Sequence, residues 1–146
     1  KRFRGVEWEV QLDPELPQIR ADAGQIQGVF INLFVNAADA MGAQDSRRSI
    51  SARTRLDART RSAEIDVQDT GPGVPAEERE SIFNLFFRGR TKGSEARVKG
   101  SGLGLAIARE LVEAHGGQIA VVGGEAGGHF RVTLPRRSAR VLADAA

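Results

Sequence analysis

The segment VKGSGLGLAIARELVEAHGG, residues 98–117, places three glycines within five positions directly before an apolar-periodic stretch. Glycine loses more conformational freedom on folding than any other residue, so this arrangement is costly unless bare backbone is needed there. The start of a helix carries unpaired backbone N–H groups and a partial positive charge, both of which attract phosphate oxygens. The segment therefore predicts a helix that begins near Gly102 and binds a phosphate-bearing ligand. A tight helix entry without a ligand is the alternative.

Two other phosphate-binding patterns do not fit these glycines. The chain contains no G-x-x-x-x-G-K-[ST] segment, which excludes a P-loop. Gly100, Gly102 and Gly104 do not form G-x-G-x-x-G after an apolar strand, so a Rossmann site is disfavoured.

Apolar residues alternate with polar ones in several short segments, with helix-periodic segments between them. The predicted strands are residues 6–12, 50–56, 63–67, 118–122 and 129–134, and the predicted helices are residues 23–41, 75–83 and 102–115. The element order and the alternation predict an α+β fold. We expect a two-layer sandwich in which about three helices cover one face of a mostly antiparallel, mixed sheet.

The same periodicity predicts which side chains are buried. The expected positions are Val6, Trp8, Val10 and Leu12 in a half-buried first strand, Ile26, Val29, Phe30, Leu33, Ala37, Ala40 and Met41 in the first helix, and Leu103, Ile107, Leu111 and Val112 in the last helix. Asp22 is the predicted N-cap of the first helix, and Gly42 is its predicted end.

A second motif, NLFVNAADAM, lies within the first helix. Asn32, Asn36 and Asp39 are spaced i, i+4 and i+7, so they share one polar stripe beside the apolar one. Asparagine is unfavourable in a helix interior, yet its amide oxygen can complete a Mg²⁺ shell built mainly from phosphates and waters. The stripe favours a divalent-cation site, and a solvated polar face is the alternative.

The third motif, DVQDTGPGVP, closes a predicted strand with Asp69. A carboxylate there can accept a hydrogen bond from the exocyclic amine of adenine, where guanine has an acceptor oxygen instead. Gly71 and Gly73 leave a flat slot for a ring. Asp69 is therefore predicted to select ATP over GTP, although D-x-G-x-G taken alone is more often a turn.

In this order the three motifs resemble the N, G1 and G2 boxes of the GHKL superfamily, whose members share the Bergerat ATP-binding fold. The segment SIFNLFFRG, residues 81–89, resembles the F box. The spacing from FFRG to the last glycines is most similar to the catalytic ATP-binding (HATPase_c) domain of bacterial sensor histidine kinases, and the resemblance covers about residues 5–135. It implies one domain over residues 1–146, with an aperiodic, mobile ATP lid at about 88–100 and a tail at 136–146.

The resemblance also implies roles for individual residues. Asn36 would bind Mg²⁺, and Asp69 would bind the adenine amine. Asn32 and Arg88 would be the catalytic residues, with Asn32 supporting the phosphate side and Arg88 reaching the γ-phosphate. Further ATP contacts are implied for Asp39, Gly71, Gly73, Val74, Lys99, Gly100, Ser101, Gly102, Leu103, Gly104 and Leu105.

Two positions depart from common family patterns. Many histidine kinases carry a basic residue three positions after the metal-binding asparagine, where this chain has Asp39, as nitrogen- and dicarboxylate-sensing relatives often do. GHKL ATPases such as gyrase tend to place a glutamate four residues before that asparagine, where this chain has Asn32. Asparagine cannot take a proton. The site is therefore expected to hold ATP for transfer to an imidazole, by positioning and charge neutralisation, rather than to hydrolyse it.

The resembling kinases also use a phosphoacceptor histidine on a dimerising helical domain. Neither His115 nor His129 is followed by the acidic residue typical of that motif, and contact with a helix C-terminus suffices to explain His115. We expect the chain to bind ATP without phosphorylating itself, to be monomeric alone and to belong to a homodimer. Its partners would be that helical domain and a downstream response regulator.

Two alternative functions remain open. One is a conformational ATPase of the gyrase, chaperone or mismatch-repair type, against which Asn32 argues. The other is a degenerate nucleotide-binding interaction module, against which the intact Asn36, Asp69 and glycines argue.

Composition excludes other classes of function. The net charge is only +2 and the arginines are spread along the chain, which favours a solvated surface over a nucleic-acid site. The absence of cysteine excludes disulfides and thiolate metal sites. No apolar run reaches the roughly 18 residues needed to cross a bilayer, so we expect no direct membrane contact by this domain. The resemblance to sensor histidine kinases implies a cytoplasmic domain of a bacterial sensor.

Overall fold

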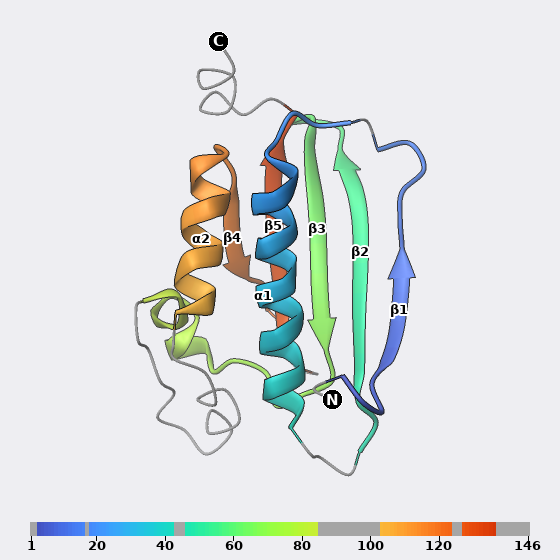
Figure 1. Cartoon of the computed structure of the whole chain (residues 1–146), viewed down its shortest axis with the longest axis vertical. Helices are drawn as coiled ribbons and strands as arrows, with labels where there is room; N and C mark the ends of the chain where they lie inside the picture. The colour runs from blue at the N-terminus through green and yellow to red at the C-terminus, as the bar shows by residue number, and fades with distance from the viewer. Residues whose placement is uncertain (1–2, 17, 43–45, 85–102, 124–126, 137–146) are drawn as a thin grey trace.

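The computed structural model describes residues 3–16, 18–42, 46–84, 103–123 and 127–136 (Figure 1). Its elements are β1 (Glu7–Gln11), α1 (Ala23–Met41), β2 (Ser49–Asp57), β3 (Ser62–Asp69), the short turns η1 (Ala76–Glu78) and η2 (Ser81–Phe83), α2 (Gly104–Ala114), β4 (Gln118–Val121) and β5 (His129–Pro135).

The strands form one sheet in the order β1-β2-β3-β5-β4. β1 pairs in parallel with β2, and the other three pairings are antiparallel. Both α-helices lie against the same face of this sheet (Figure 1). The predicted α+β fold with a mostly antiparallel, mixed sheet is confirmed. Among the described residues two α-helices, rather than three, cover that face, because the segment expected to supply the third forms two separate turns.

Helix α1 begins and ends where the sequence predicts. The Asp22 side chain accepts a hydrogen bond from the backbone N–H of Gln25 at 3.0 Å, which caps the helix start. Gly42 ends the helix with φ +54°, a conformation that favours glycine. Its predicted core side chains contribute to the core: Val29, Leu33, Ala37, Ala40 and Met41 are buried, and Ile26 and Phe30 pack partly buried against them.

Helix α2 buries part of the predicted face: the prediction for Val112 is confirmed, Leu111 packs partly buried against the core, and Leu103 is intermediate in exposure. Ala108 and Val112 are fully buried, whereas Ile107 is 43% exposed, so the prediction for Ile107 is wrong. The small side chain of Ala108 lies at the centre of the buried face, where a short side chain permits close packing of the helix. Helical periodicity identified the element, but it did not distinguish a small residue in the core from a large one at its margin.

The segment predicted as one short helix over residues 75–83 forms two 3₁₀ turns instead. Their backbone bonds run from Glu78 N–H to Pro75 O and from Phe83 N–H to Glu80 O, three residues apart. The break between the turns directs Ile82 and Phe83 into the core, where the Phe83 ring meets Phe130 edge-on with centroids 6.1 Å apart. Tertiary packing decides the local geometry here.

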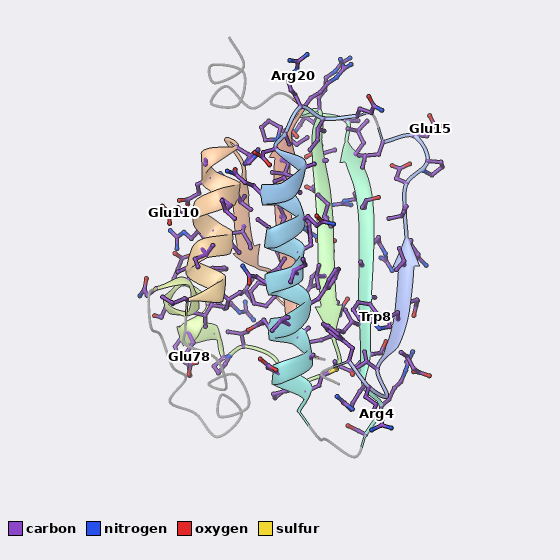
Figure 2. All side chains as sticks on the ribbon, viewed as in Figure 1. Arg4, Trp8, Glu15, Arg20, Glu78 and Glu110 are labelled. Carbon is purple, nitrogen blue, oxygen red and sulfur yellow. The ribbon has the colours of Figure 1, made fainter. Side chains whose placement is uncertain are left out.

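Alternation correctly predicts strand β1, but not its burial. Trp8, Val10 and Leu12 are 46%, 57% and 67% exposed, so the expected half-buried strand is wrong for these positions. β1 lies at the edge of the sheet, beyond α1 and far from α2 (Figure 1). Trp8, labelled in Figure 2, contacts the Phe34 ring of α1 at 5.3 Å between centroids.

Candidate functional site

Asp69 lies at the end of β3, the central strand, and is only 2% exposed. Its Oδ1 accepts hydrogen bonds from the backbone N–H groups of Gly71 at 2.8 Å and Gly128 at 3.0 Å. Its own backbone N–H donates to Gly128 O at 2.9 Å. These bonds fix the orientation of the carboxylate and supply donors for a buried acidic group.

Gly71 and Gly73 lie where a side chain would have little room. A Cβ at Gly71 would lie 3.0 Å from Asp69 Oδ1 and 3.4 Å from the backbone of Ala40 on α1. Gly73 has φ +82° and lies near Gly127 O. Val74 follows as part of the buried core, 8% exposed. The G1 motif thus joins the end of β3 to the C-terminal part of α1.

Gly127 and Gly128 belong to the same site, and sequence analysis did not single them out. Gly127 has φ +116°, and a Cβ there would overlap the backbone oxygen of Asp69. The only sequence signal was the glycine-rich stretch between the last two predicted strands, which was interpreted as a turn. Its glycines let the backbone approach Asp69 closely enough to bind its carboxylate.

The polar stripe of α1 is half-buried rather than fully solvated: Asn32, Asn36 and Asp39 are each intermediate in exposure. Asn36 Nδ2 is buried and has no hydrogen-bond partner among the residues that the structure describes. Because the oxygen and nitrogen of an amide side chain can exchange places by a flip, this end of the group can equally present an oxygen. Buried side-chain amides nearly always have a hydrogen-bond partner, so this group is a candidate for contact with a ligand.

The N-terminus of α2 lies against this stripe. A Cβ at Gly104 would be 3.5 Å from Asn32 Oδ1, so the first turn of α2 and the middle of α1 are in contact. Leu103 occupies the N-cap position and makes no side-chain capping bond. Among the described residues the first helical bond runs from Ile107 N–H to Leu103 O, and the N–H groups of residues 104–106 have no described intrahelical acceptor.

A metal ion could not be held here by acidic residues alone. The described residues contain no group of three or more His, Cys, Asp or Glu side chains able to bind a metal. An ion that takes one amide oxygen and completes its shell with phosphate oxygens and waters fits the Asn36 position, since Mg²⁺ is usually bound in that way.

The structure therefore brings together most of the predicted site that it describes. Asp69, Gly71, Gly73 and Val74 follow β3, Asn32, Asn36 and Asp39 lie on α1, and Leu103, Gly104 and Leu105 start α2. Arg88, Lys99, Gly100, Ser101 and Gly102, the predicted lid and most of the predicted tail lie outside the described residues.

The chain matches the family model described as "Histidine kinase-, DNA gyrase B-, and HSP90-like ATPase" over residues 21–138. It is 39% identical over 136 residues to Sensor protein KdpD of Escherichia coli, a match that covers 91% of this chain and 14% of that protein. The chain spans between 14% and 36% of the length of the curated relatives it matches.

Solved structures resemble the fold closely. The catalytic domain of histidine kinase ThkA is 32% identical, with a TM-score of 0.73, and the match covers 90% of this chain and 81% of that one. Full-length ShkA, solved in complex with AMPPNP, is 29% identical with a TM-score of 0.73, over 92% of this chain and 26% of that one. In the part of the chain that the structure describes, no helix has the length and apolar character needed to span a membrane.

Proposed function

Because this chain belongs to the family of histidine kinase-, DNA gyrase B- and HSP90-like ATPases, we propose that it binds Mg²⁺-ATP and delivers the γ-phosphate to a histidine on a separate phosphoacceptor domain. It would act as the catalytic domain of a sensor histidine kinase. Three observations support the proposal: the buried carboxylate of Asp69 is followed by Gly71, which approaches Ala40 of α1; Asn36 of the same helix has a buried amide; and the start of α2 lies against Asn32.

The adenine end of the proposed site is Asp69. Its carboxylate is held by the backbone of Gly71 and Gly128, so it can meet the exocyclic amine of adenine without reorganising. A carboxylate accepts hydrogen bonds but cannot donate one when ionised. ATP, which offers an amine there, would be bound in preference to GTP, which offers an oxygen.

The phosphate end of the proposed site lies between α1 and α2. Asn36 would hold a Mg²⁺ ion, and that ion would neutralise charge on the β- and γ-phosphates. The backbone N–H groups at the start of α2 would donate to phosphate oxygens, with the partial positive charge of the helix N-terminus reinforcing them. Asn32, in contact with Gly104, would hold the two elements of this end together.

The absence of a general base at Asn32 favours transfer over hydrolysis. Phosphoryl transfer requires in-line positioning and charge stabilisation more than covalent chemistry from the protein. An amide cannot accept the proton of an attacking water, whereas a neutral imidazole needs no deprotonation by the enzyme to attack. This supports a histidine acceptor over the conformational-ATPase alternative.

The partners and the location follow from the same proposal. The phosphoacceptor histidine would belong to a dimerising helical domain, and a response regulator would receive the phosphoryl group from it. We propose that the domain works in the cytoplasm, where ATP is available. Arg88 and the ATP lid stay predictions by resemblance.

Calorimetry on the 146-residue chain tests the proposal. The wild type should bind ATP more tightly with Mg²⁺ than with a chelator, and Asn36→Ala should remove that difference. Gln27→Ala, an exposed amide on the same helix, is the matched control and should bind like the wild type. Unchanged Mg²⁺-ATP affinity in N36A would reject the metal role of Asn36. Failure of the wild type to transfer labelled phosphate to a histidine-bearing phosphoacceptor domain supplied in trans would reject the kinase function.

A further inference from the structure

His115 follows the last turn of α2 and is 1% exposed, one of the largest fully buried side chains among the described residues. Its Nδ1 lies 2.8 Å from Leu111 O, within the same helix. Its Nε2 lies 3.1 Å from the backbone nitrogen of Asp22, the N-cap residue of α1. The ring therefore joins the end of α2 to the beginning of α1. Contact with the C-terminus of its own helix explains only the first of these bonds.

The two partners determine the form of the imidazole. A carbonyl oxygen can only accept a hydrogen bond, so Nδ1 must carry the proton that is donated to Leu111 O. A backbone N–H can only donate, so Nε2 must be unprotonated to accept from Asp22. His115 is thus a neutral imidazole in the Nδ1–H form, and both ring nitrogens are satisfied.

The bond to Asp22 lies at one end of the helix pair, and the candidate phosphate site lies farther along it. Residues 22 and 32 of α1 face residues 115 and 104 of α2, respectively, so the helices run antiparallel with similar spacing between the two contacts. At 1.5 Å per residue the contacts are about 16 Å apart. A helix transmits an axial shift along its length, so movement at residue 115 would change the approach of Gly104 to Asn32.

We propose that His115 is a positioning residue for the phosphate site: its Nε2 bond to the Asp22 N–H sets the axial register of α2 against α1. That register places the first N–H groups of α2 opposite Asn32 and Asn36. This inference rests on the proposed ATP-binding function. It assigns to His115 no contact with the nucleotide and no role in accepting phosphate.

Two substitutions separate the local bond from the bond between helices. The amide nitrogen of Asn coincides roughly with His Nδ1, so His115→Asn can keep the bond to Leu111 O and lose the bond to Asp22. The amide oxygen of Gln reaches roughly the place of Nε2, so His115→Gln can restore an acceptor for the Asp22 N–H. Val132→Ala, fully buried in β5 and bonded to neither helix end, controls for a general loss of stability.

The experiment compares, for each protein, the dissociation constant for Mg²⁺-ATP with that for adenosine. Adenosine carries no phosphate, so its affinity depends on the Asp69 end of the site alone. The ratio of the two dissociation constants therefore reports on the phosphate end. We expect H115N to weaken Mg²⁺-ATP relative to adenosine by about tenfold, because small displacements of positioned groups have large effects. H115Q and V132A should keep the wild-type ratio. An H115N ratio equal to that of the wild type would overturn the inference, as would an equal change in H115N and V132A.

Two further results keep the interpretation unambiguous. If the wild type binds adenosine but gains no affinity from the phosphates and Mg²⁺, the proposed function fails before His115 is tested. Two-bond ¹H–¹⁵N spectra of the wild-type imidazole need no variant to fold. They should show the Nδ1–H form of His115, and an Nε2–H form would exclude the bond to Asp22 on which the inference depends.

Discussion

The two ends of the α1–α2 pair differ in how their polar groups are paired. Where α1 begins and α2 ends, the Asp22 side chain caps its own helix, its backbone N–H donates to His115 Nε2, and both nitrogens of that buried ring have partners. Where α2 begins, Leu103 provides no side-chain cap, and the buried Asn36 Nδ2 of α1 has no partner in the described part of the chain. Buried polar groups are nearly always paired, so the contrast separates an end whose polar groups contribute stability from the end that we propose binds the nucleotide phosphates.

The largest effect on stability is expected from a substitution that disturbs the backbone of the proposed ligand site, beside Asp69. Gly127→Ala would place a Cβ against the backbone oxygen of Asp69 at φ +116°, so the chain must move or strain. We expect a loss of about 2–4 kcal/mol in the free energy of unfolding, measured by urea denaturation. Gly28→Ala on α1 is the matched control, because nothing lies within 4 Å of its new Cβ. That variant should gain up to about 1 kcal/mol, since alanine favours helix. Equal stabilities for G127A and the wild type would contradict the close approach.

Asp69→Asn should damage binding while leaving the fold nearly intact. The amide oxygen of Asn can still accept from the N–H groups of Gly71 and Gly128, but its NH₂ group cannot accept from the adenine amine. A hydrogen bond to a charged group is worth about 1.5–3 kcal/mol, so ATP affinity should fall by about 10- to 100-fold. Calorimetry with ATP and GTP checks this. If the wild type binds both nucleotides equally, the selection argument for Asp69 is wrong.

Sequence periodicity predicted the fold well because most elements bury one face on one core. The helix over residues 23–41, its Asp22 cap and its Gly42 end are all confirmed. The incorrect predictions concern burial. They occur where the position of an element beside its neighbours determines which side chains are exposed. The edge position of β1 leaves Trp8 and Val10 exposed although they alternate like a buried strand, and Ile107 lies outside the face that Ala108 and Val112 bury.

The candidate site was predictable only in part for a related reason. Motif spacing places Asn32 and Asn36 on one helix and Asp69 at the end of a strand, but it contains no information about segments that meet from far along the chain. Gly128 binds the Asp69 carboxylate from 59 residues away, and His115 binds Asp22 from 93 residues away. Such contacts depend on sheet order and helix register, which a single local pattern does not determine.

A smaller effect on the free energy of unfolding is expected where α1 begins and α2 ends, the end of the helix pair whose polar groups have partners. Asp22→Ala removes the capping bond to Gln25 but retains the backbone N–H that donates to His115. Loss of an N-cap side chain costs about 1 kcal/mol, which urea denaturation should detect. The affinity for Mg²⁺-ATP should stay unchanged, because the bond that connects the helices is preserved. A fall in affinity as large as that of H115N would contradict the separation of the capping side chain from the backbone contact.

The smallest effect on the free energy of unfolding is expected at Asp66, on the face of the sheet opposite the two α-helices. Its carboxylate has partners, as do the polar groups where α1 begins. Its Oδ1 accepts from Arg131 Nε at 2.8 Å, and His129 Nε2 lies 3.5 Å away. Burial raises the pKa of Asp66, but the hydrogen bonds and charges of Arg131 and His129 outweigh it, so the pKa lies below its ordinary value of 3.8.

A carboxylate with a lowered pKa in the folded state stabilises the fold above its unfolded pKa, and this contribution is lost as pH falls through the folded pKa. Asp66→Asn should therefore destabilise the chain by less than about 1 kcal/mol near pH 7, in urea denaturation, because the pair is only partly shielded from water. The difference from the wild type should shrink as pH falls below 3.8. Glu9→Gln, which removes an exposed carboxylate of β1, is the control for the loss of one negative charge.

A difference that persists undiminished in acid would mean that Asp66 stabilises the sheet through its shape and neutral hydrogen bonds rather than its charge. The paired polar groups of this fold would then contribute through geometry alone.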